Sequence, residues 1–168
     1  MKLEGSCHCK AVRFRVESNT PYPYQRCYCS ICRKTQGGGG YAINIMGWAD
    51  SLEIEGEENI SIYHAVTEAG VSELERRFCS KCGSGLWVYH DKWPDLVHPF
   101  ASAIDTDLPM PPETVHIMTE FKASWVEPAR GPKHSHFEGY PDKSIEVWHE
   151  AVAVSQTGPE SGNGDQNG

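Results

Sequence analysis

Three cysteines within six residues form the part of this sequence best suited to chemistry. Cys27, Cys29 and Cys32 stand in the pattern C-x-C-x-x-C. A turn, or the first turn of a helix, can point three thiols so close in sequence into one small volume. Zinc favours tetrahedral sulfur coordination, and three protein thiolates leave a fourth position for water or a substrate. The spacing therefore predicts an open and potentially reactive metal site.

The other four of the seven cysteines form two distant pairs. Cys7 and Cys9 lie near the N-terminus, and Cys79 and Cys82 follow about seventy residues later. Four thiolates complete a tetrahedron, so the two pairs predict a second, closed zinc site. Such a site would connect the first strand to the middle of the chain and couple metal binding to folding.

Disulfides, inert buried thiols and an iron–sulfur cluster are the alternatives. The number of cysteines is odd, and residues 1–5 lack the apolar core of a signal peptide, which favours metal binding over disulfides. An iron–sulfur cluster uses the same ligands, so the spacing leaves that choice open. A histidine could also close the three-cysteine site. The candidate fourth ligands are His8, His64, His90, His98 and His116.

Short strands must position these cysteines. Alternating apolar and polar residues, punctuated by glycine and proline, predict strands rather than long helices. The predicted strands cover residues 11–17, 41–46, 51–56, 60–64, 73–78 and 86–89, with further ones within 96–103 and 114–118. One short helical turn is predicted, over residues 30–36, which carry Cys32 and Arg33. The pattern predicts an all-β fold.

The cysteine motifs and their surroundings occur in a recognisable order. They are Gly5–Cys9, Cys27–Gly37 and Phe78–Gly83, supported by Ser102–Asp105 and by His116–Ile117. With all seven cysteine positions matching, the chain resembles the glutathione-dependent formaldehyde-activating enzyme family, which also includes centromere protein V. The resemblance covers about residues 3–127.

This resemblance implies an Mss4-like fold of small antiparallel sheets stapled by zinc. It also implies that Cys27, Cys29 and Cys32 hold a catalytic zinc that the thiol of glutathione approaches. A thiolate is the nucleophilic form of a thiol, and a metal bound by thiolates can deprotonate an incoming thiol at neutral pH. The implied reaction is reversible addition of glutathione to formaldehyde, which gives S-hydroxymethylglutathione and is a carbon–sulfur lyase reaction in reverse.

Residues beside the open cysteines are candidates for substrate binding. Arg33 offers a bidentate fork to a carboxylate, whereas Lys34 is interpreted as a solvated surface charge. Gly38 and Gly39 belong to a run of four glycines that could present backbone amides to an anion or act as a hinge. Tyr41 follows this run and would line the pocket.

Two arginines precede the last cysteine pair. Arg76 and Arg77 are adjacent on a predicted strand, so one should face inwards and the other outwards. At most one of them is expected to have a functional role.

Composition restricts the classes of function. The formal charge is −8, from 15 basic and 23 acidic residues, which disfavours a general nucleic-acid-binding role. No apolar run is long enough to span a membrane. Metal-bound thiolates and the absence of an export signal predict a cytoplasmic protein. With 168 residues, the chain should form one zinc-binding domain over 1–127, an extension packed on it over 128–150, and a disordered tail over 151–168.

Two functions fit these features. The first is a zinc-dependent carbon–sulfur lyase or synthase that acts on an adduct of a glutathione-type thiol and an aldehyde. The second is a zinc-stapled module that binds a thiol or a protein without turnover. The discriminating feature is an exchangeable fourth ligand at the three-cysteine site, because an enzyme needs one and a structural module does not.

Overall fold

The computed structural model describes residues 1–19, 22 and 25–156, and in these residues the chain is mostly β-structure. The strands are β1 (Lys2–Ser6), β2 (Arg13–Glu17), β3 (Gln25–Cys27), β4 (Ala42–Asn44), β5 (Gly47–Trp48), β6 (Glu53–Glu55), β7 (Ile60–Thr67), β8 (Gly70–Cys79), β9 (Gly85–Tyr89), β10 (Leu96–Pro99), β11 (Thr114–Ile117) and β12 (His134–His136). The helices are α1 (Ser30–Gln36) and α2 (Ile145–Gln156), and the 3-10 turns are η1 (Ala49–Ser51), η2 (Glu57–Asn59), η3 (Ala101–Ala103) and η4 (Thr119–Phe121).

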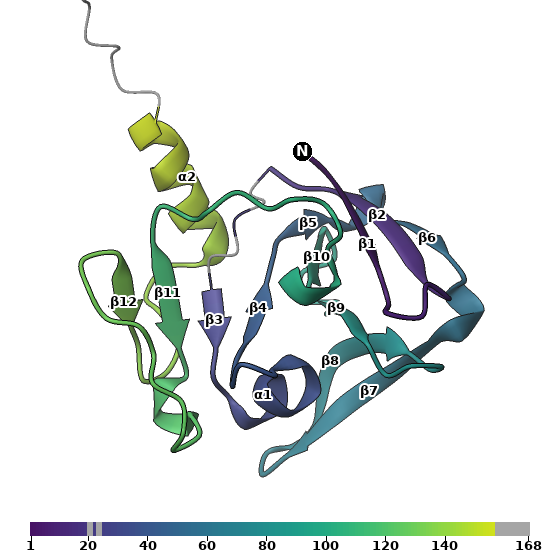
Figure 1. Cartoon of the computed structure of the whole chain (residues 1–168), viewed down its shortest axis with the longest axis horizontal. Coiled ribbons are helices and arrows are strands. Elements are labelled where there is room, and N and C mark those ends of the chain that lie inside the picture. The colour runs from purple at the N-terminus through teal and green to yellow at the C-terminus, as the bar shows by residue number, and fades with distance from the viewer. Residues whose placement is uncertain (20–21, 23–24, 157–168) are drawn as a thin grey trace, which may run out of the picture.

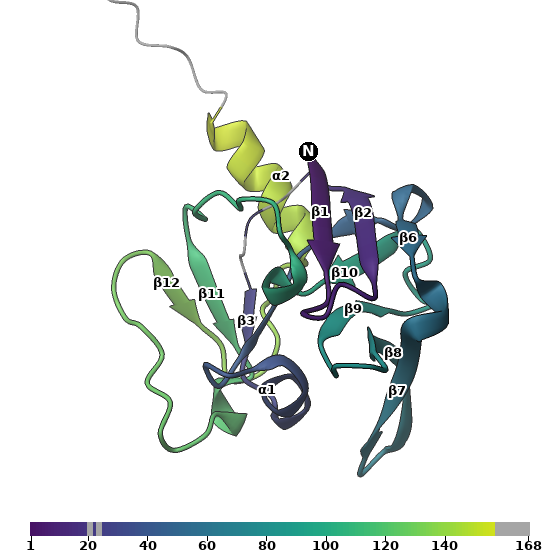
Figure 2. The same cartoon turned by 45° about the vertical axis from the view of Figure 1, so that its right-hand side comes forward.

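The strands form three small sheets. Their orders are β1-β2-β6, β5-β10-β9-β8-β7 and β12-β11-β3-β4. Figures 1 and 2 show the third sheet on one side of the molecule and the first on the other, with α1 between β3 and the long hairpin of β7 and β8. The small antiparallel sheets expected from the sequence are present in the first two. The third sheet differs, because β11 runs parallel to both β3 and β12.

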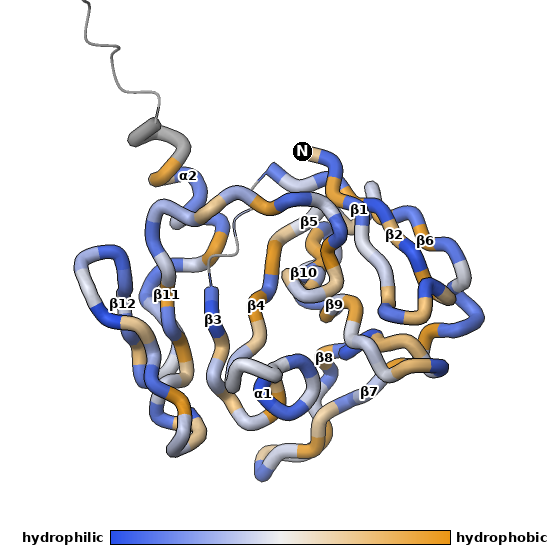
Figure 3. Tube along the Cα trace, viewed as in Figure 1, coloured by the Kyte–Doolittle hydropathy of each residue, from blue (hydrophilic) through white to orange (hydrophobic). Residues whose placement is uncertain are grey.

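Alternation along the strands builds the core. In β2, Phe14 and Val16 are buried while the residues around them are exposed. Phe14 meets Trp87 of β9 edge to face, with ring centroids 5.1 Å apart. The tube in Figure 3 shows apolar residues along β4 and β10 in the interior. The three sheets therefore share one hydrophobic core.

The segment that carries the three cysteines begins as a strand and ends as a helix. Cys27 is the last residue of β3, and Cys29 is the N-cap of α1. Tyr28 connects the two elements, and its amide donates to the carbonyl of Ile117 on β11 (3.1 Å). The helix spans residues 30–36, as the sequence predicts.

Residues after 127 add structure to the third sheet. The residues of β12 pair in parallel with β11, so that His134 lies beside Thr114 and His136 beside His116. Residues 145–148 begin the helix α2. Trp148 of α2 is buried, and its indole N–H donates to the carboxylate of Glu113 (3.3 Å).

The helix continues to residue 156, where apolar and small residues extend its turns. It thus includes the first six residues of the segment 151–168 that was expected to be a disordered tail. Residues 157–168 of that tail lie outside the described residues. No helix in the described part of the chain is long and apolar enough to cross a membrane.

Candidate functional site

The two distant cysteine pairs come together at one end of the five-stranded sheet. The sulfur atoms of Cys7 and Cys9 are 3.6 Å apart, and those of Cys9 and Cys79 are 3.8 Å apart. With Cys82, all four sulfur atoms lie within 4.8 Å of one another. Four sulfur atoms around a zinc ion, with bonds of about 2.3 Å, are separated by roughly 3.8 Å. This cluster, Cys7/Cys9/Cys79/Cys82, therefore has the dimensions of a closed tetrahedral metal site.

Tight turns set the positions of these four thiols. After the first pair, Lys10 takes a left-handed conformation (φ 60°) and its amide donates to the carbonyl of Cys7 (3.0 Å). The amide of Val12 donates to the sulfur of Cys7 (3.2 Å). After the second pair, Gly83 is also left-handed (φ 73°), and its amide donates to the carbonyl of Cys79 (2.8 Å). An N–H group directed at sulfur favours the thiolate form, which is the metal-ligating form.

The other three cysteines form a separate cluster at the start of α1. The sulfur atoms of Cys27, Cys29 and Cys32 lie within 4.8 Å of one another. Cys27 and Cys32 are each 6% exposed, whereas Cys29 is half-buried. The sulfur of Cys29 caps the helix by accepting from the amide of Cys32 (3.3 Å). Among the described residues, no histidine or carboxylate joins the three thiols, and the Cys29 side is the one nearest to solvent.

Crowding makes the three thiols suited to a cation. Hydrogen bonds from the thiols of Cys27 and Cys32 lower the pKa of Cys29 to about 2. Hydrogen bonding with Cys29 and Cys32 raises the pKa of Cys27. Ionisation of one of the three thiols therefore disfavours ionisation of the other two. Three thiolates can exist together here only if a cation offsets their charge, so the donor set fits a metal ion.

One of the histidines considered as a fourth ligand, His116, has other partners. His116 is fully buried, and its Nδ1 is 2.7 Å from the hydroxyl of Tyr28. Its Nε2 is 3.1 Å from Nδ1 of His134, and the ring of His136 stacks on it at 4.5 Å. His134 is half-buried and His136 is exposed. This network holds Tyr28, and through it the loop between two of the cysteines.

Buried histidines should make the stability of the fold depend on pH. Burial, with the charges of His136, Arg26 and His134, lowers the pKa of His116 from 6.5 to about 4, and burial also lowers the pKa of His98 and of His149. Between pH 4 and 6.5 the unfolded chain binds protons that the folded chain does not, so stability should fall as the pH falls through this window. His116 alone should lower the free energy of unfolding by about 3 kcal/mol as the pH falls through this window.

Urea unfolding at a series of pH values measures this effect. The slope of the unfolding free energy against pH reports how many more protons the unfolded chain binds than the folded chain. In His116→Gln this difference should decrease by up to one proton. Metal content is followed in parallel, because acid also releases metal from thiolates. An unchanged slope in the variant, with metal retained, would assign the pH dependence to other groups.

The predicted substrate-binding residues lie on two sides of α1. The ring of Tyr41 contacts that of Tyr28 (centroids 5.3 Å apart), and the guanidinium of Arg26 lies 4.9 Å above Tyr41. Gly39 lies against the Tyr41 ring, while the space around Gly38 is open. Gly40 has a positive φ of 85° and packs so closely on Val126 that a Cβ would come within 2.3 Å of it.

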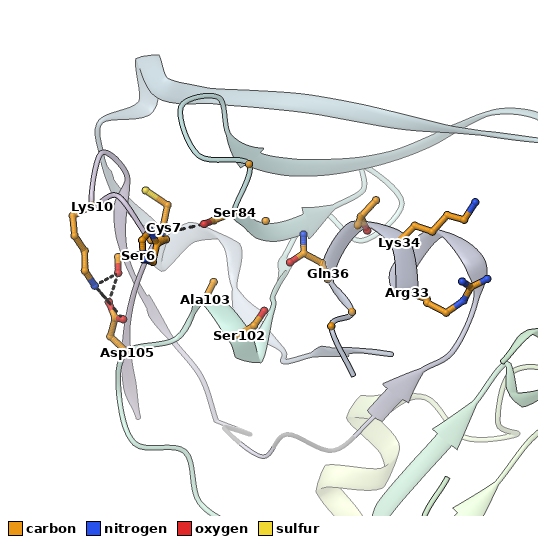
Figure 4. A pocket seen from close by; sticks show the side chains of 16 residues that line it. Ser6, Cys7, Lys10, Arg33, Lys34, Gln36, Ser84, Ser102, Ala103 and Asp105 are labelled. Atoms are coloured by element: carbon orange, nitrogen blue, oxygen red, sulfur yellow. Dashed lines mark hydrogen bonds and ion pairs between the residues drawn. The ribbon is translucent and has the colours of Figure 1, made fainter. Parts of the chain in front are cut away.

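A groove of about 890 Å³ runs between α1 and the first cysteine turn (Figure 4). At one end the amine of Lys10 donates to Ser6 (2.7 Å) and pairs with Asp105 (3.4 Å). At the other end are Arg33 and Lys34 of α1, with no acidic residue among the lining side chains there. Gly38 also lines the groove, but none of the three clustered cysteines does. The groove therefore lies beside α1, and its lining does not include the three-cysteine cluster.

Two further polar residues lie near the three-cysteine cluster. Arg76 is the inward-facing member of the arginine pair, and its charge acts on the thiol of Cys32. Tyr140 lies beyond every cysteine motif, and the charges of the three thiols act on its hydroxyl. Strand alternation indicated that one arginine faces inwards. No pattern in the sequence indicated Tyr140, because it is far along the chain from the three cysteines whose charges act on it.

The chain is similar to a family model and to known proteins. The model of the family described as "Glutathione-dependent formaldehyde-activating enzyme" matches residues 2–120. A protein of Halomonas elongata named "Putative glutathione-dependent formaldehyde-activating enzyme" is 59% identical over 156 residues, which are 93% of this chain and 99% of that protein. A protein of Rhodobacter sphaeroides with a known crystal structure has 27% sequence identity to this chain. The match covers 65% of this chain and 92% of that protein's chain, with a TM-score of 0.48.

The family model spans most of the chain, and the Halomonas relative is similar over nearly the full length of both proteins. The range matched by the family model contains all seven cysteines of the two thiol clusters. The chain belongs to the glutathione-dependent formaldehyde-activating enzyme family.

Proposed function

We propose that this protein is a zinc-dependent carbon–sulfur lyase or synthase that joins formaldehyde to the thiol of glutathione or a similar thiol. The observation that carries the proposal is the cluster of Cys27, Cys29 and Cys32, which no fourth protein ligand completes among the described residues. Family membership and the name of the Halomonas relative support the choice of reaction.

The chemistry of the donor sets supports zinc as the metal. Each cluster offers only sulfur, which suits zinc and excludes hard cations such as magnesium and calcium. The Cys7/Cys9/Cys79/Cys82 cluster would hold a structural ion, and the three-cysteine cluster an exchangeable one. An ion in the open cluster would supply a site that holds the substrate sulfur as a thiolate near neutral pH.

Residues of the chain would bind and orient the thiol. The Nε atom of Arg33 is buried and has no hydrogen-bond partner among the described residues. Together with Lys34 it makes one end of the groove positive, which suits the carboxylates of a tripeptide thiol. Because Arg33 directly follows Cys32, a thiol bound in this way would have its peptide part beside α1 and its sulfur near the cluster. Tyr28 is hydrogen-bonded to His116 and would keep the neighbouring residues Cys27 and Cys29 in place.

We also propose a cytoplasmic location, since all seven cysteines are free and a reducing compartment keeps them so. Residues 1–127 would form the metal-binding domain, and 128–150 an extension packed on it. Contacts of β12 and α2 with residues of β11 and the preceding turn are consistent with this division.

Exchange spectroscopy by NMR tests the function directly. Isotope-labelled formaldehyde and glutathione also equilibrate without a catalyst, and exchange between formaldehyde hydrate and the adduct reports the rate of the reaction above that background. The enzyme should raise the exchange rate in proportion to its concentration, and removal of metal with a chelator should return it to background. A small thiol without carboxylates should react more slowly if the groove recognises a tripeptide. Binding of glutathione without faster exchange would contradict catalysis and favour a thiol-binding module.

A further inference from the structure

Arg76 is a buried cation whose hydrogen-bonding groups are only partly satisfied by the described residues. It lies in the middle of β8, is 8% exposed, and its Nε and Nη1 atoms have no hydrogen-bond partner among the described residues. The neighbouring Arg77 faces the other side of the sheet, where its Nε donates to the carboxylate of Glu75 (3.0 Å). A buried guanidinium with unpaired N–H groups is costly, so it indicates a site for an oxygen atom or an anion.

The position of Arg76 places that site beside the three-cysteine cluster. Its positive charge acts on the thiol of Cys32 and on the hydroxyl of Tyr140. Arg76 thus lies on the inner side of the cluster, opposite the solvent. The carboxylates of a tripeptide would have to be buried to reach it, whereas the single oxygen of a one-carbon substrate is small enough to do so.

Tyr140 approaches the same cluster from the solvent side. The amide of Met118 donates to the carbonyl of Gly139 (2.9 Å), and the preceding residue, Ile117, is paired with Cys27 across β11 and β3. The backbone next to Tyr140 is therefore fixed one strand away from the cysteines. The side chain is 76% exposed, and the charges of Cys27, Cys29 and Cys32 act on its hydroxyl, which places Tyr140 on the solvent side of the cluster.

We propose that Arg76 and Tyr140 together bind the oxygen of the aldehyde at the three-cysteine cluster, an inference that rests on the proposed function. During addition, the sulfur electron pair forms the carbon–sulfur bond and the carbonyl π electrons move to oxygen. Arg76 donates hydrogen bonds to the developing oxyanion from the buried side. Tyr140 donates a hydrogen bond from its hydroxyl to the same oxygen at the solvent side, and water supplies the proton that completes the hydroxyl group of the adduct. In the reverse reaction water takes the hydroxyl proton as the carbon–sulfur bond breaks, while Arg76 and Tyr140 stabilise the same oxygen by hydrogen bonds.

Removal of one hydroxyl tests the role of Tyr140 with little risk to the fold. Tyr140→Phe should lower kcat for exchange by ten- to a hundredfold, with little change in the Kd for glutathione, the metal content or the melting temperature. The control is Tyr89→Phe. Tyr89 is paired with Glu75, so it lies on the face of the five-stranded sheet opposite to Arg76. The control should retain the wild-type kcat. A Tyr140→Phe enzyme with wild-type kcat would overturn the proposed role of Tyr140.

Arg76 is tested by two substitutions and a neighbouring control. Arg76→Met should lower kcat by about a hundredfold or more, and Arg76→Lys should restore part of the loss by keeping the charge without the fork. Arg77→Met should leave kcat unchanged. A raised KM and Kd for glutathione with unchanged kcat would mean that Arg76 binds a carboxylate. Loss of metal from Arg76→Met would mean that Arg76 only balances the charge of the thiolates. Either result would overturn the proposal for Arg76.

The wild-type enzyme separates this proposal from the proposed function. If the wild type does not accelerate exchange, the reaction itself is wrong. If the wild type accelerates exchange and both Tyr140→Phe and Arg76→Met match it, only the oxygen site is wrong.

Discussion

Replacing Cys79 with serine should unfold the domain. Cys79 is fully buried and joins β8 to the first cysteine turn through the Cys7/Cys9/Cys79/Cys82 cluster. A structural zinc site contributes on the order of 10 kcal/mol to folding, which is comparable to the whole stability of a typical domain. Circular dichroism should show lost β-structure or a greatly lowered melting temperature, and elemental analysis should show lost metal.

The matched control for Cys79→Ser lies in the same turn. Lys81 is exposed and lies between the two cysteines of the second pair, so Lys81→Ala should melt like the wild type. Chelation of metal from the wild type should reproduce the behaviour of Cys79→Ser. A Cys79→Ser protein that stays folded with wild-type stability would show that the four thiols do not form a structural metal site.

Replacing Cys29 with serine should abolish catalysis and preserve the fold. Serine is a good N-cap residue, so it can replace the helix-capping role of the Cys29 sulfur, which accepts from the amide of Cys32. Serine does not replace a thiolate as a zinc ligand, because thiolates, imidazoles and carboxylates are the usual ligands. Exchange of formaldehyde with glutathione should therefore fall at least a hundredfold, to near the uncatalysed rate.

Metal counting makes the Cys29→Ser experiment decisive. The wild type should bind two metal ions per chain and the variant one, with melting temperatures within a few degrees of each other. Ser30→Ala, one residue along, should keep both ions and the wild-type rate. Two ions and full activity in Cys29→Ser would exclude a catalytic ion at this cluster. One ion in both proteins would mean that only the closed site is occupied.

From the sequence, the metal-binding cysteines could be predicted more completely than the residues that surround them. Local patterns suffice to place α1 over residues 30–36 and to locate most strands, because alternation and helix capping act over a few residues. The division of cysteines into four and three follows from ligand chemistry and is matched by the two groups of sulfur atoms. The alternation of β8 also showed that one of Arg76 and Arg77 faces inwards, although only the packing decides which.

What the sequence did not reveal depends on pairing between distant segments. β3 and β12 each have only three residues, and neither Gln25–Cys27 nor His134–His136 alternates clearly enough to predict a strand. Both become strands because β11 lies between them. The hydrogen bonds of His116 and the approach of Tyr140 follow from the same pairing, so they too could not be deduced from local sequence.

The separation of the two thiol clusters along the chain has a consequence for synthesis on the ribosome. Five cysteines, those up to residue 32, emerge before Cys79 and Cys82 have been made. The nascent chain thus presents enough thiolates to surround one zinc ion in a non-native set, for example Cys9 with the three clustered cysteines. The native arrangement requires that any such ion be exchanged once the second pair emerges. A free-zinc supply that is too high during translation should therefore slow maturation of this protein.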